Sequence, residues 1–407
     1  MDSSFAGGNL VRVENAGGSD VRSLFRQTDG KIVALALGSN VTIGQALTRL
    51  NNDGSVDASF GGDGTVLFQW KLVQPRDTYY GNAYGAAVQT VNGTERIIVV
   101  GGSPMLSGKK VLTDRLRIER LMPDGSPDQS WGVNGTLLLN LDQAYSVAIQ
   151  PWDQKIIIGT GPRNQLVRFT QTGQIDTSFG TGGFASVAMT QTGDLHFDAL
   201  GRLLSVGILN TASKGGSIVW TPAIARHDSN GSPDLSFGSN GRVIAGFNVS
   251  YSTTRLAIDP FGNLVLGSTS GPTSSASDYT VERFTSSGIP DYSFSEDGIA
   301  TVDFYAQRDL ASALAVQSDG SVVVAGNTVL VGSGATSDMA MARLDYWGKL
   351  DPVFGNGGRI VFPHVPGGEG IRALLTANDP SWVGERFYAF GINNQANQLL
   401  AARFLEY

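Results

Sequence analysis

The fold is decided by a short stretch that recurs along the chain. Its clearest copy is residues 226–241, RHDSNGSPDLSFGSNG, in which an Arg precedes an Asp-x-Ser-Phe-Gly motif by eight residues and a Gly follows the Asp by seven. Looser copies bring the number of units to seven. The Asp that begins the motif is, in turn, Asp2, Asp57, Asp128, Asp176, Asp234, Asp291 and Asp351. The Arg residues at the matching position are Arg49, Arg120, Arg168, Arg226, Arg283, Arg343 and Arg403.

The two ends of the chain are halves of one unit. Asp2 has no Arg before it, and Arg403 has no motif after it. A linear solenoid gives no reason for this circular register and carries atypical capping repeats, whereas a ring of blades has to close on itself. The sequence therefore predicts an all-β, seven-bladed β-propeller with four-stranded blades, forming one domain over 1–407. We expect a strand at about 9–14 to pair with a strand at about 399–405 and close the ring.

Each unit reads as four short strands joined by tight turns. In one unit, apolar runs at 311–316, 321–326, 339–344 and 359–362 are separated by turn residues, and Asp319-Gly320 is a typical hairpin turn. The chain contains 53 glycines and only 16% charged residues. That composition suits short strands and tight turns better than helices.

The unit also resembles a known repeat family. The stretches Arg49 to Gly64, Arg226 to Gly241 and Gln317 to Gly326 are similar to the delta-60 repeat of bacterial secreted and surface proteins, and the third copy departs from the pattern at Trp131. The resemblance covers essentially the whole chain. It implies a β-propeller and supplies no common activity. Because the chain starts inside a unit, we expect that an export signal has been removed and that the protein is secreted, periplasmic or displayed on the cell surface.

Composition excludes several classes of function. The net charge is −7, without the basic stretches that nucleic-acid binding needs. The absence of Cys rules out disulfides and thiolate metal sites. No apolar run is long enough to span a bilayer. The three histidines, His196, His227 and His364, form no cluster of metal-binding spacing. We expect a monomer that binds neither nucleic acid nor a cofactor.

The predicted strand order places the loops on two faces of the ring. Lettering the strands of a blade a to d from the axis outward, the a–b and c–d turns carry the Asp-Gly and Asp-x-Ser-Phe motifs on what we call the motif face. The b–c loops and d–a crossings lie on the opposite, variable face. The variable loops are predicted at 71–84, 103–113, 208–217, 268–277 and 328–337. Variable loops on a rigid scaffold often carry function, so we expect a ligand there; the alternative is that they are tolerated insertions.

The repeated Arg and Asp residues are predicted to be structural, because a single catalytic site does not need seven copies. We expect each Asp to cap its own loop, each Arg to bridge to that Asp or to loop carbonyls, and the motif aromatic to pack between blades. Asn51 to Asp57 and, less closely, Pro123 to Asp128 resemble calcium loops, but both lack the terminal bidentate Glu. A plain turn is the favoured interpretation, and calcium is the alternative.

The leading functional hypothesis is a non-catalytic extracellular adhesion module that presents the variable face to a glycan or a protein. The candidate binding residues are Trp70, Arg76, Asp77, Tyr79, Tyr80, Tyr84, Tyr305 and His364. Their aromatic members are expected to form a platform for sugars or a protein, or else to pack their own loop. One alternative is a hydrolase or lyase at the channel mouth, with His364, Asp77, Asp309 or Glu369 as general base. Another is a passive spacer.

Overall fold

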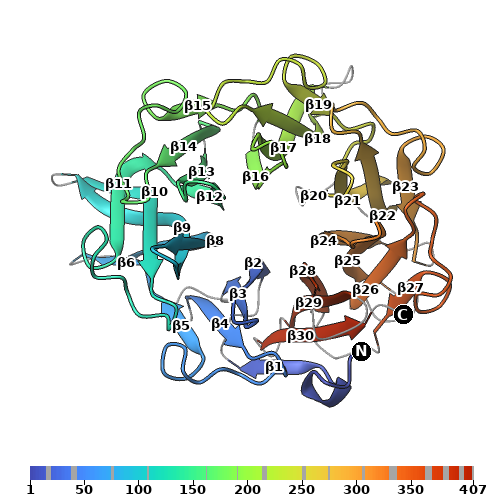
Figure 1. Cartoon of the computed structure of the whole chain (residues 1–407), viewed down its shortest axis with the longest axis horizontal. Helices are drawn as coiled ribbons and strands as arrows, with labels where there is room; N and C mark the ends of the chain where they lie inside the picture. The colour runs from blue at the N-terminus through green and yellow to red at the C-terminus, as the bar shows by residue number, and fades with distance from the viewer. Residues whose placement is uncertain are drawn as a thin grey trace.

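The regular structure of the protein is almost entirely β-strand, arranged as blades around a central axis (Figure 1). The computed structural model describes residues 1–14, 20–37, 44–74, 78–107, 110–161, 163–189, 191–212, 218–249, 254–273, 276–304, 308–329, 337–362, 369–378, 385–393 and 398–405. Within these ranges the only helical element is a 3-10 turn, η1, at Ala6–Gly8. None of the described residues forms a helix that is both long and apolar enough to cross a membrane.

Seven four-stranded antiparallel sheets make up the ring, which confirms the predicted seven-bladed β-propeller. Blade 1 contains β2 (Asp20–Arg26), β3 (Ile32–Leu37), β4 (Gln45–Leu50) and β5 (Thr65–Phe68). Blade 2 contains β8 (Asn82–Val91), β9 (Thr94–Ser107), β10 (Lys110–Leu121) and β11 (Thr136–Asp142). Blade 3 contains β12 (Ala144–Ile149), β13 (Ile156–Thr160), β14 (Gln165–Phe169) and β15 (Phe184–Ser186). Blade 4 contains β16 (Gln191–Phe197), β17 (Leu203–Ala212), β18 (Ile218–His227) and β19 (Arg242–Ile244).

The remaining blades follow the same order. Blade 5 contains β20 (Arg255–Ile258), β21 (Leu264–Thr273), β22 (Ala276–Phe284) and β23 (Ile299–Val302). Blade 6 contains β24 (Asp309–Val316), β25 (Val322–Thr328), β26 (Asp338–Leu344) and β27 (Arg359–Val361). Blade 7 contains β28 (Glu369–Asn378), β29 (Glu385–Asn393), β30 (Gln398–Leu405) and, from the other end of the chain, β1 (Val11–Glu14).

Middle strands are apolar on both faces because each blade packs against its two neighbours. All seven residues of β25 and all seven of β26 are buried. The apolar clusters lie between adjacent blades, so burial continues around the ring. The first strand of each blade lies nearest the axis, as expected (Figure 1).

The N-terminal strand closes the ring. β1 pairs antiparallel with β30, with Val11 opposite Ala401 and Glu14 opposite Gln398. Two residues beyond this pairing on β30, Arg403 donates a hydrogen bond from Nε to Oδ2 of Asp2 over 2.7 Å. The predicted pairing of the two chain ends is therefore confirmed, and it removes an exposed sheet edge.

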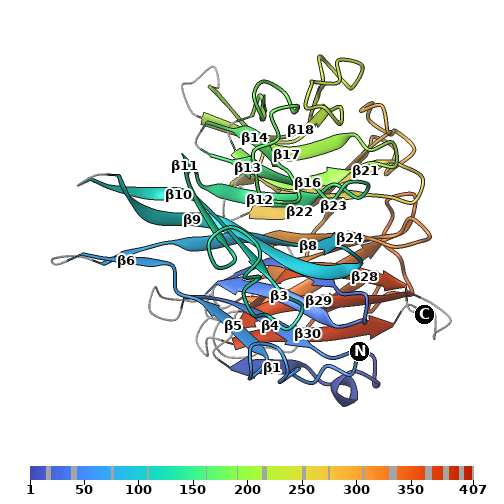
Figure 2. The ribbon, with the colours of Figure 1, turned by 60° about the vertical axis from the view of Figure 1, so that its left-hand side comes forward.

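Several of the predicted variable loops are extended hairpins instead. In blade 2, β9 and β10 continue pairing to Ser107 and Lys110, inside the range predicted as loop 103–113. Strands β17–β18 and β21–β22 extend in the same way into 208–217 and 268–277. The crossing 71–84 contains a small hairpin of β6 (Lys71–Val73) and β7 (Thr78–Tyr80). In Figure 2, β6 and the β9–β10 hairpin project from the same side of the ring.

Candidate functional site

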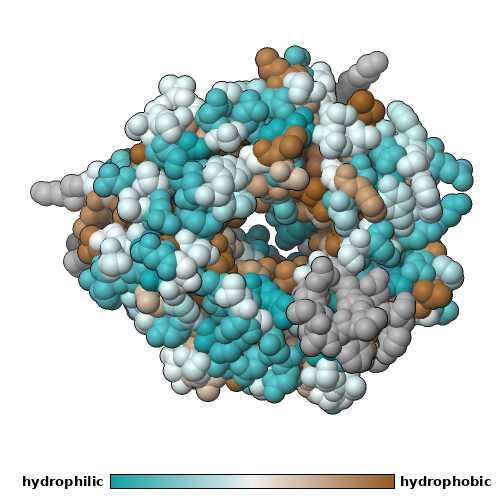
Figure 3. Space-filling view, in the orientation of Figure 1, coloured by the Kyte–Doolittle hydropathy of each residue, from teal (hydrophilic) through white to brown (hydrophobic). Residues whose placement is uncertain are grey.

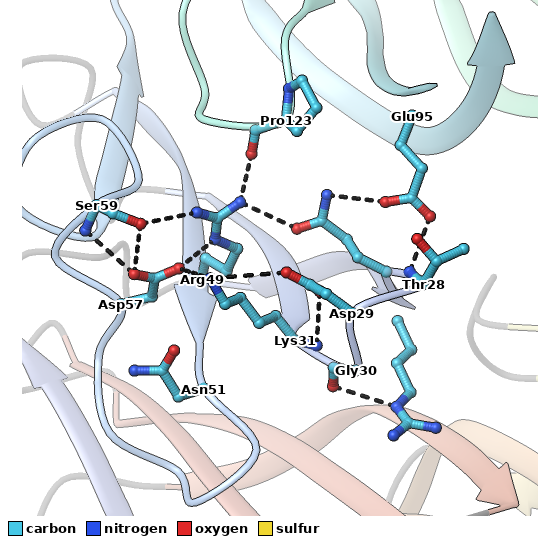
Figure 4. Close-up of polar contacts among 12 residues, drawn as sticks. Thr28, Asp29, Gly30, Lys31, Arg49, Asn51, Asp57, Ser59, Glu95 and Pro123 are labelled. Carbon is cyan, nitrogen blue, oxygen red and sulfur yellow. Dashed lines mark hydrogen bonds and ion pairs between the residues drawn. The ribbon is translucent and has the colours of Figure 1, made fainter. Parts of the chain in front are cut away.

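The repeated Arg and Asp residues form an internal clamp that links neighbouring blades (Figure 4). In blade 1, Oδ1 of Asp57 accepts hydrogen bonds from the amide and the hydroxyl of Ser59, at 3.1 and 2.7 Å. Arg49 donates from Nε to Oδ2 of Asp57 over 2.7 Å, and from Nη1 to the carbonyl of Pro123 in blade 2. The same Arg-to-Asp bond occurs in all seven units.

The motif aromatic completes the clamp. The Arg49 guanidinium lies 4.6 Å from the centre of the Phe60 ring, which is fully buried. Phe60 packs under the next blade's turn at Gly125, where φ is +87° and a Cβ would lie 3.0 Å from the ring. Only Gly suits both that backbone and that close approach. These polar atoms and rings are occupied by the fold, so a ligand has to be held by other residues.

The two stretches that resemble calcium loops are built as turns. Oδ1 of Asp53 accepts from the amide and hydroxyl of Ser55, at 2.9 and 2.6 Å. Asp124 accepts from Ser126 in the same way, at 2.9 and 2.7 Å. Their carboxylates are therefore already engaged in local turn contacts.

The described members of the predicted aromatic platform lie in different environments. Trp70 is 3% exposed in the core between blades 1 and 2, where Nε1 donates to Oε1 of Glu119 over 2.7 Å. Its ring is therefore enclosed by the fold and presents almost no surface to a ligand. Tyr79 and Tyr80 lie on the outlying β7, and Tyr80 is 42% exposed. Tyr84 lies instead on the inner strand β8 and lines the central channel.

The other predicted functional residues fall outside the channel or outside the described residues. Arg76, Asp77, Tyr305 and His364 lie outside the described residues. Glu369 begins β28, and its side chain is likewise not described. Asp309 is fully buried between blades 5 and 6, so as a general base at the channel mouth it is misplaced.

Six blades each contribute a polar side chain to the central channel, and in blade 6 the matching position holds Ser312, which is buried and donates its hydroxyl to the carbonyl of Ile371. We call these residues the channel ring: Arg22, Tyr84, Tyr145, Asp194, Arg255, Ser312 and Arg372. Each lies near the start of an inner strand, on the variable face. Figure 3 looks down the axis and shows the hollow. All members except Ser312 line two adjoining cavities of ≈ 130 and ≈ 250 Å³.

β-bulges position most of the channel ring. The register between β2 and β3 shifts on either side of Arg22, and the same shift flanks Tyr84, Tyr145, Ser312 and Arg372 in their blades. A shift in β16 spans the segment containing Asp194. A bulge leaves one residue outside the ladder and re-aims its side chain. Most of the channel ring is therefore positioned by a β-bulge that recurs at the same place in the inner strands.

The charges of the channel ring are only partly balanced. Arg22 pairs with Asp20 at 3.0 Å, and Arg255 pairs with Asp194 at 3.7 Å. Arg372 has no hydrogen-bond or ion-pair partner among the residues whose side chains are described. These three arginines and two carboxylates give the described part of the mouth a net positive charge, although the whole chain carries −7.

Burial lowers the pKa of Arg372, and the charges of Arg255 and Arg22 act in the same direction against the opposing charge of Asp20. The partly desolvated cation thus has Asp20 and two other arginines around it, and Asp20 is the strongest single charge acting on it. An anionic group arriving beside it would relieve this electrostatic cost.

Two tyrosines form the apolar side of the mouth. The rings of Tyr84 and Tyr145 lie 5.5 Å apart at a tilt of 50°, and the Arg22 guanidinium lies 5.9 Å from the Tyr84 ring. Gln143 donates from Nε2 to the Tyr145 hydroxyl over 2.8 Å. Burial and the neighbouring Tyr145 raise the pKa of Tyr84, so its phenol stays neutral. The mouth therefore combines guanidinium groups with neutral aromatic faces.

The most exposed aromatic side chains lie on the opposite face. Trp152, Phe261, Tyr292 and Trp347, in motif-face turns, are each more than half exposed. Phe261 packs edge-on against Tyr346 at 5.2 Å, next to the clamp of its blade. The expected broad aromatic patch on the variable face is thus not found among the described residues. This surface provides a control for any test of the channel mouth.

Most of the channel ring was missed by reasoning from the sequence. Only Tyr84 was predicted, and for a different reason. A signal exists nevertheless: Val21-Arg22-Ser23, Ala144-Tyr145-Ser146 and Ile371-Arg372-Ala373 occupy one position of the unit, and its central residue changes character between blades. A position that varies within an otherwise repeated unit indicates a site more specifically than the repeated residues do.

Comparisons with known proteins agree with this architecture. The model of the family described as "Domain of unknown function (DUF5122) beta-propeller" matches residues 27–60, 155–179 and 317–354, and each match includes one motif Asp and ends at or near the motif aromatic. No curated protein matches the sequence.

A solved structure of a protein of unknown function from Dyadobacter fermentans DSM 18053 aligns with 98% of this chain and 99% of its own, at 11% identity and a TM-score of 0.40. That likeness is too distant to support an inference. The resemblance to the delta-60 repeat itself stays a prediction. The family match and the ring of blades together show that the chain is a β-propeller, with repeats similar to those of the DUF5122 family.

Proposed function

We propose that the protein is a non-catalytic binding module that holds an acidic glycan at the channel mouth on the variable face. The observation that supports this most is Arg372, a partly buried cation without an ion-pair partner among the described side chains. A carboxylate can accept two parallel hydrogen bonds from one guanidinium, which makes such a group specific for planar anions.

The rest of the channel ring suits a sugar acid better than a small inorganic anion. Tyr84 and Tyr145 present a tilted aromatic pair, and aromatic rings offer apolar area together with a polar hydroxyl. Asp20 and Asp194 can accept hydrogen bonds from sugar hydroxyls while they remain paired with Arg22 and Arg255. The larger cavity, ≈ 250 Å³, is slightly below the usual range for drug-sized ligands. It would take one terminal residue of a glycan and leave the remainder on the rim.

Several observations favour binding over catalysis. Described carboxylates whose pKa is strongly raised lie outside the mouth: burial raises the pKa of Glu282 to about 7 and that of Asp309 to about 6. The mouth carboxylates, Asp20 and Asp194, are both ion-paired. A hydrolase or lyase would be expected to place raised-pKa acids together in one pocket. A passive spacer would have no need for a partly buried cation that lacks an ion-pair partner among the described side chains.

We further propose, from the resemblance to the delta-60 repeat, that the module works outside the cell in adhesion. The projecting β6–β7 and β9–β10 hairpins would then flank the bound glycan on the same face.

The proposal is tested by a glycan array that contains acidic and neutral glycans. Wild-type protein is expected to bind acidic glycans, and Arg372→Gln is expected to weaken that binding about 10-fold or more, as for loss of a hydrogen bond to a charged group. Arg12→Gln, which removes an exposed Arg on the outer strand β1, should bind like wild type.

A second control separates the two faces. Trp347→Ala removes an exposed aromatic of the motif face and should leave binding unchanged. Binding that Trp347→Ala abolishes and Arg372→Gln retains would place the site on the wrong face. Absence of binding to every acidic glycan would overturn the proposed ligand class.

A further inference from the structure

Three carboxylates converge on the variable face between blades 5 and 6, away from the channel ring. Asp278 lies on β22, Asp303 directly follows β23, and Asp309 begins β24. One carboxylate oxygen from each lies within 4.8 Å of the others. The two blades thus bring together residues that are up to 31 positions apart in the sequence (309 − 278).

The innermost of these carboxylates has an unused oxygen. Asp309 is 0% exposed, and its Oδ2 accepts from the backbone amide of Phe304 over 2.7 Å. Its Oδ1 is buried and has no hydrogen-bond partner. A buried acceptor that lacks a partner destabilises the fold, and more strongly when it is charged. The orphaned oxygen therefore has no partner among the residues that the structure describes, and it can accept a ligand from outside the chain.

The electrostatics of the cluster indicate the sign of that partner. Burial, together with the charges of Asp278 and Asp303, raises the pKa of Asp309 to about 6, against the opposing effects of the nearby Thr328 hydroxyl and the bond from the Phe304 amide. Burial also raises the pKa of Asp278, and Asp303 adds to the rise. The strongest charges acting on both groups are thus other carboxylates. A cation between them would remove both the repulsion and the orphaned acceptor.

We propose that Asp278, Asp303 and Asp309 form a binding site for a hard divalent cation of the calcium class. Calcium is bound by six to eight oxygens at about 2.3–2.6 Å, so ligands on opposite sides of the ion lie up to ~4.6–5.2 Å apart. The three oxygens all lie within 4.8 Å of one another, so a single ion of this size can contact all three. Magnesium demands near-ideal octahedral geometry and usually keeps several waters, so a cluster of protein carboxylates suits calcium better. The cation would join blade 5 to blade 6 at the edge of the variable face.

The site lies beside rigid elements. Ser277 donates from its hydroxyl to the carbonyl of Asp309 over 3.1 Å, and Thr269 accepts from the amide of Ala311 over 2.8 Å. The buried ring of Tyr279 lies 5.0 Å from that of Phe304. Tyr279 follows Asp278 directly, so its phenol can transfer excitation energy to a lanthanide that replaces calcium.

The test uses the full chain and two readouts. The thermal midpoint is measured against calcium concentration, and terbium luminescence is measured with excitation of tyrosine. The expected result is a midpoint that rises with calcium, with an apparent Kd on the order of 0.1–1 mM, as in extracellular modules. Terbium should luminesce, and calcium should displace it.

Isosteric variants locate the effect. Asp309→Asn keeps an oxygen for the Phe304 amide and is expected to weaken calcium binding at least about 10-fold, with an unchanged or higher midpoint in the absence of calcium. Asp303→Asn, at the exposed position of the cluster, provides a second variant if Asp309→Asn fails to fold. Asp228→Asn, an exposed motif-face change of equal charge, is the matched control.

Three results would overturn the proposal. The first is an unchanged midpoint up to ~10 mM calcium together with no sensitised terbium luminescence. The second is a calcium response that persists in the Asp303→Asn and Asp309→Asn variants, since the ion would then act elsewhere. The third is a response to magnesium without a response to calcium, which would contradict the calcium class.

Discussion

Replacing Asp2 by Ala tests how strongly the two chain ends are held together. Asp2 is 3% exposed, and its carboxylate accepts a hydrogen bond from Nε of Arg403 over 2.7 Å. It also accepts hydrogen bonds from the amide and the hydroxyl of Ser4, over 2.8 and 2.7 Å. Removing one partner of a buried ion pair costs about 3–5 kcal/mol. Arg403 would keep its bond to the carbonyl of Asn52 over 2.7 Å, so we expect the lower end, about 3 kcal/mol.

The expected shift in thermal midpoint follows from the size of the protein. Unfolding entropy of about 2.1 cal/mol/K per residue gives ~0.85 kcal/mol/K for a chain of 407 residues. Asp2→Ala should therefore lower the midpoint by ~3–4 °C in differential scanning calorimetry. Hydrogen exchange should also accelerate in β1 and β30, because the closing pair loses its anchor.

Asp351→Ala provides the matched control. It breaks the same type of clamp inside blade 6, where the Asp side chain is 17% exposed and no chain end is released. A smaller shift is expected, without faster exchange in β1. A change of less than about 1 °C for Asp2→Ala, with unchanged exchange in β1, would refute the reasoning that this clamp holds the ring closed.

Three further predictions concern the clamp and the core. The pKa of Asp57 is lowered because bonds from Lys31 and Ser59 and the charge of Arg49 outweigh the effect of burial. The stability that this carboxylate contributes is present above its unfolded pKa of about 3.9 and is lost as pH falls below that value. Urea unfolding at pH 7 and pH 3 measures the loss, and equal stability at the two pH values would contradict the prediction. Trp70→Ala should lower the free energy of unfolding by about 3–5 kcal/mol in the same assay and leave acidic-glycan binding unchanged. Weaker glycan binding by a folded variant would show that Trp70 contributes to the binding site. Gly125→Ala should lower the thermal midpoint more than Gly62→Ala, because both have positive φ but only Gly125 would press a Cβ against a neighbouring ring; equal shifts would show that the close approach is unimportant.

Repetition in the sequence made the architecture predictable. The missing Arg before Asp2 and the missing motif after Arg403 were sufficient to predict ring closure, and β1 pairs with β30 as expected. Hairpin lengths were not predictable in the same way. Residues 208–217 contain a Gly-Gly turn dipeptide at 215–216, but the polar run before it gives no sign that pairing extends β17 to Ala212. Polar, Gly-containing segments of this kind are read as loops unless their pairing partner is known.

The channel mouth was harder to predict than the fold. Its polar cavity-lining side chains come from six blades, and their convergence depends mostly on bulges that the sequence does not reveal. Trp70 illustrates the opposite error: an aromatic residue beside a long crossing was interpreted as exposed, yet it fills the space between two blades. Asp309 was singled out for its charge, but the role that we propose for it depends on Asp278 and Asp303, which lie close to it only in the folded ring.

The most direct test of the proposed function is a double-mutant cycle between Arg372 and the carboxylate of a bound glycan. Affinities of wild type and Arg372→Gln would be measured by calorimetry for an acidic glycan selected on the array and for its methyl ester. If the carboxylate rests on Arg372, the ester and the variant should each weaken binding, and the two losses should not add, with a coupling of about 1–3 kcal/mol. Additive losses, with a coupling near zero, would show that Arg372 does not contact the acid and would contradict the assignment of the channel mouth as the binding site.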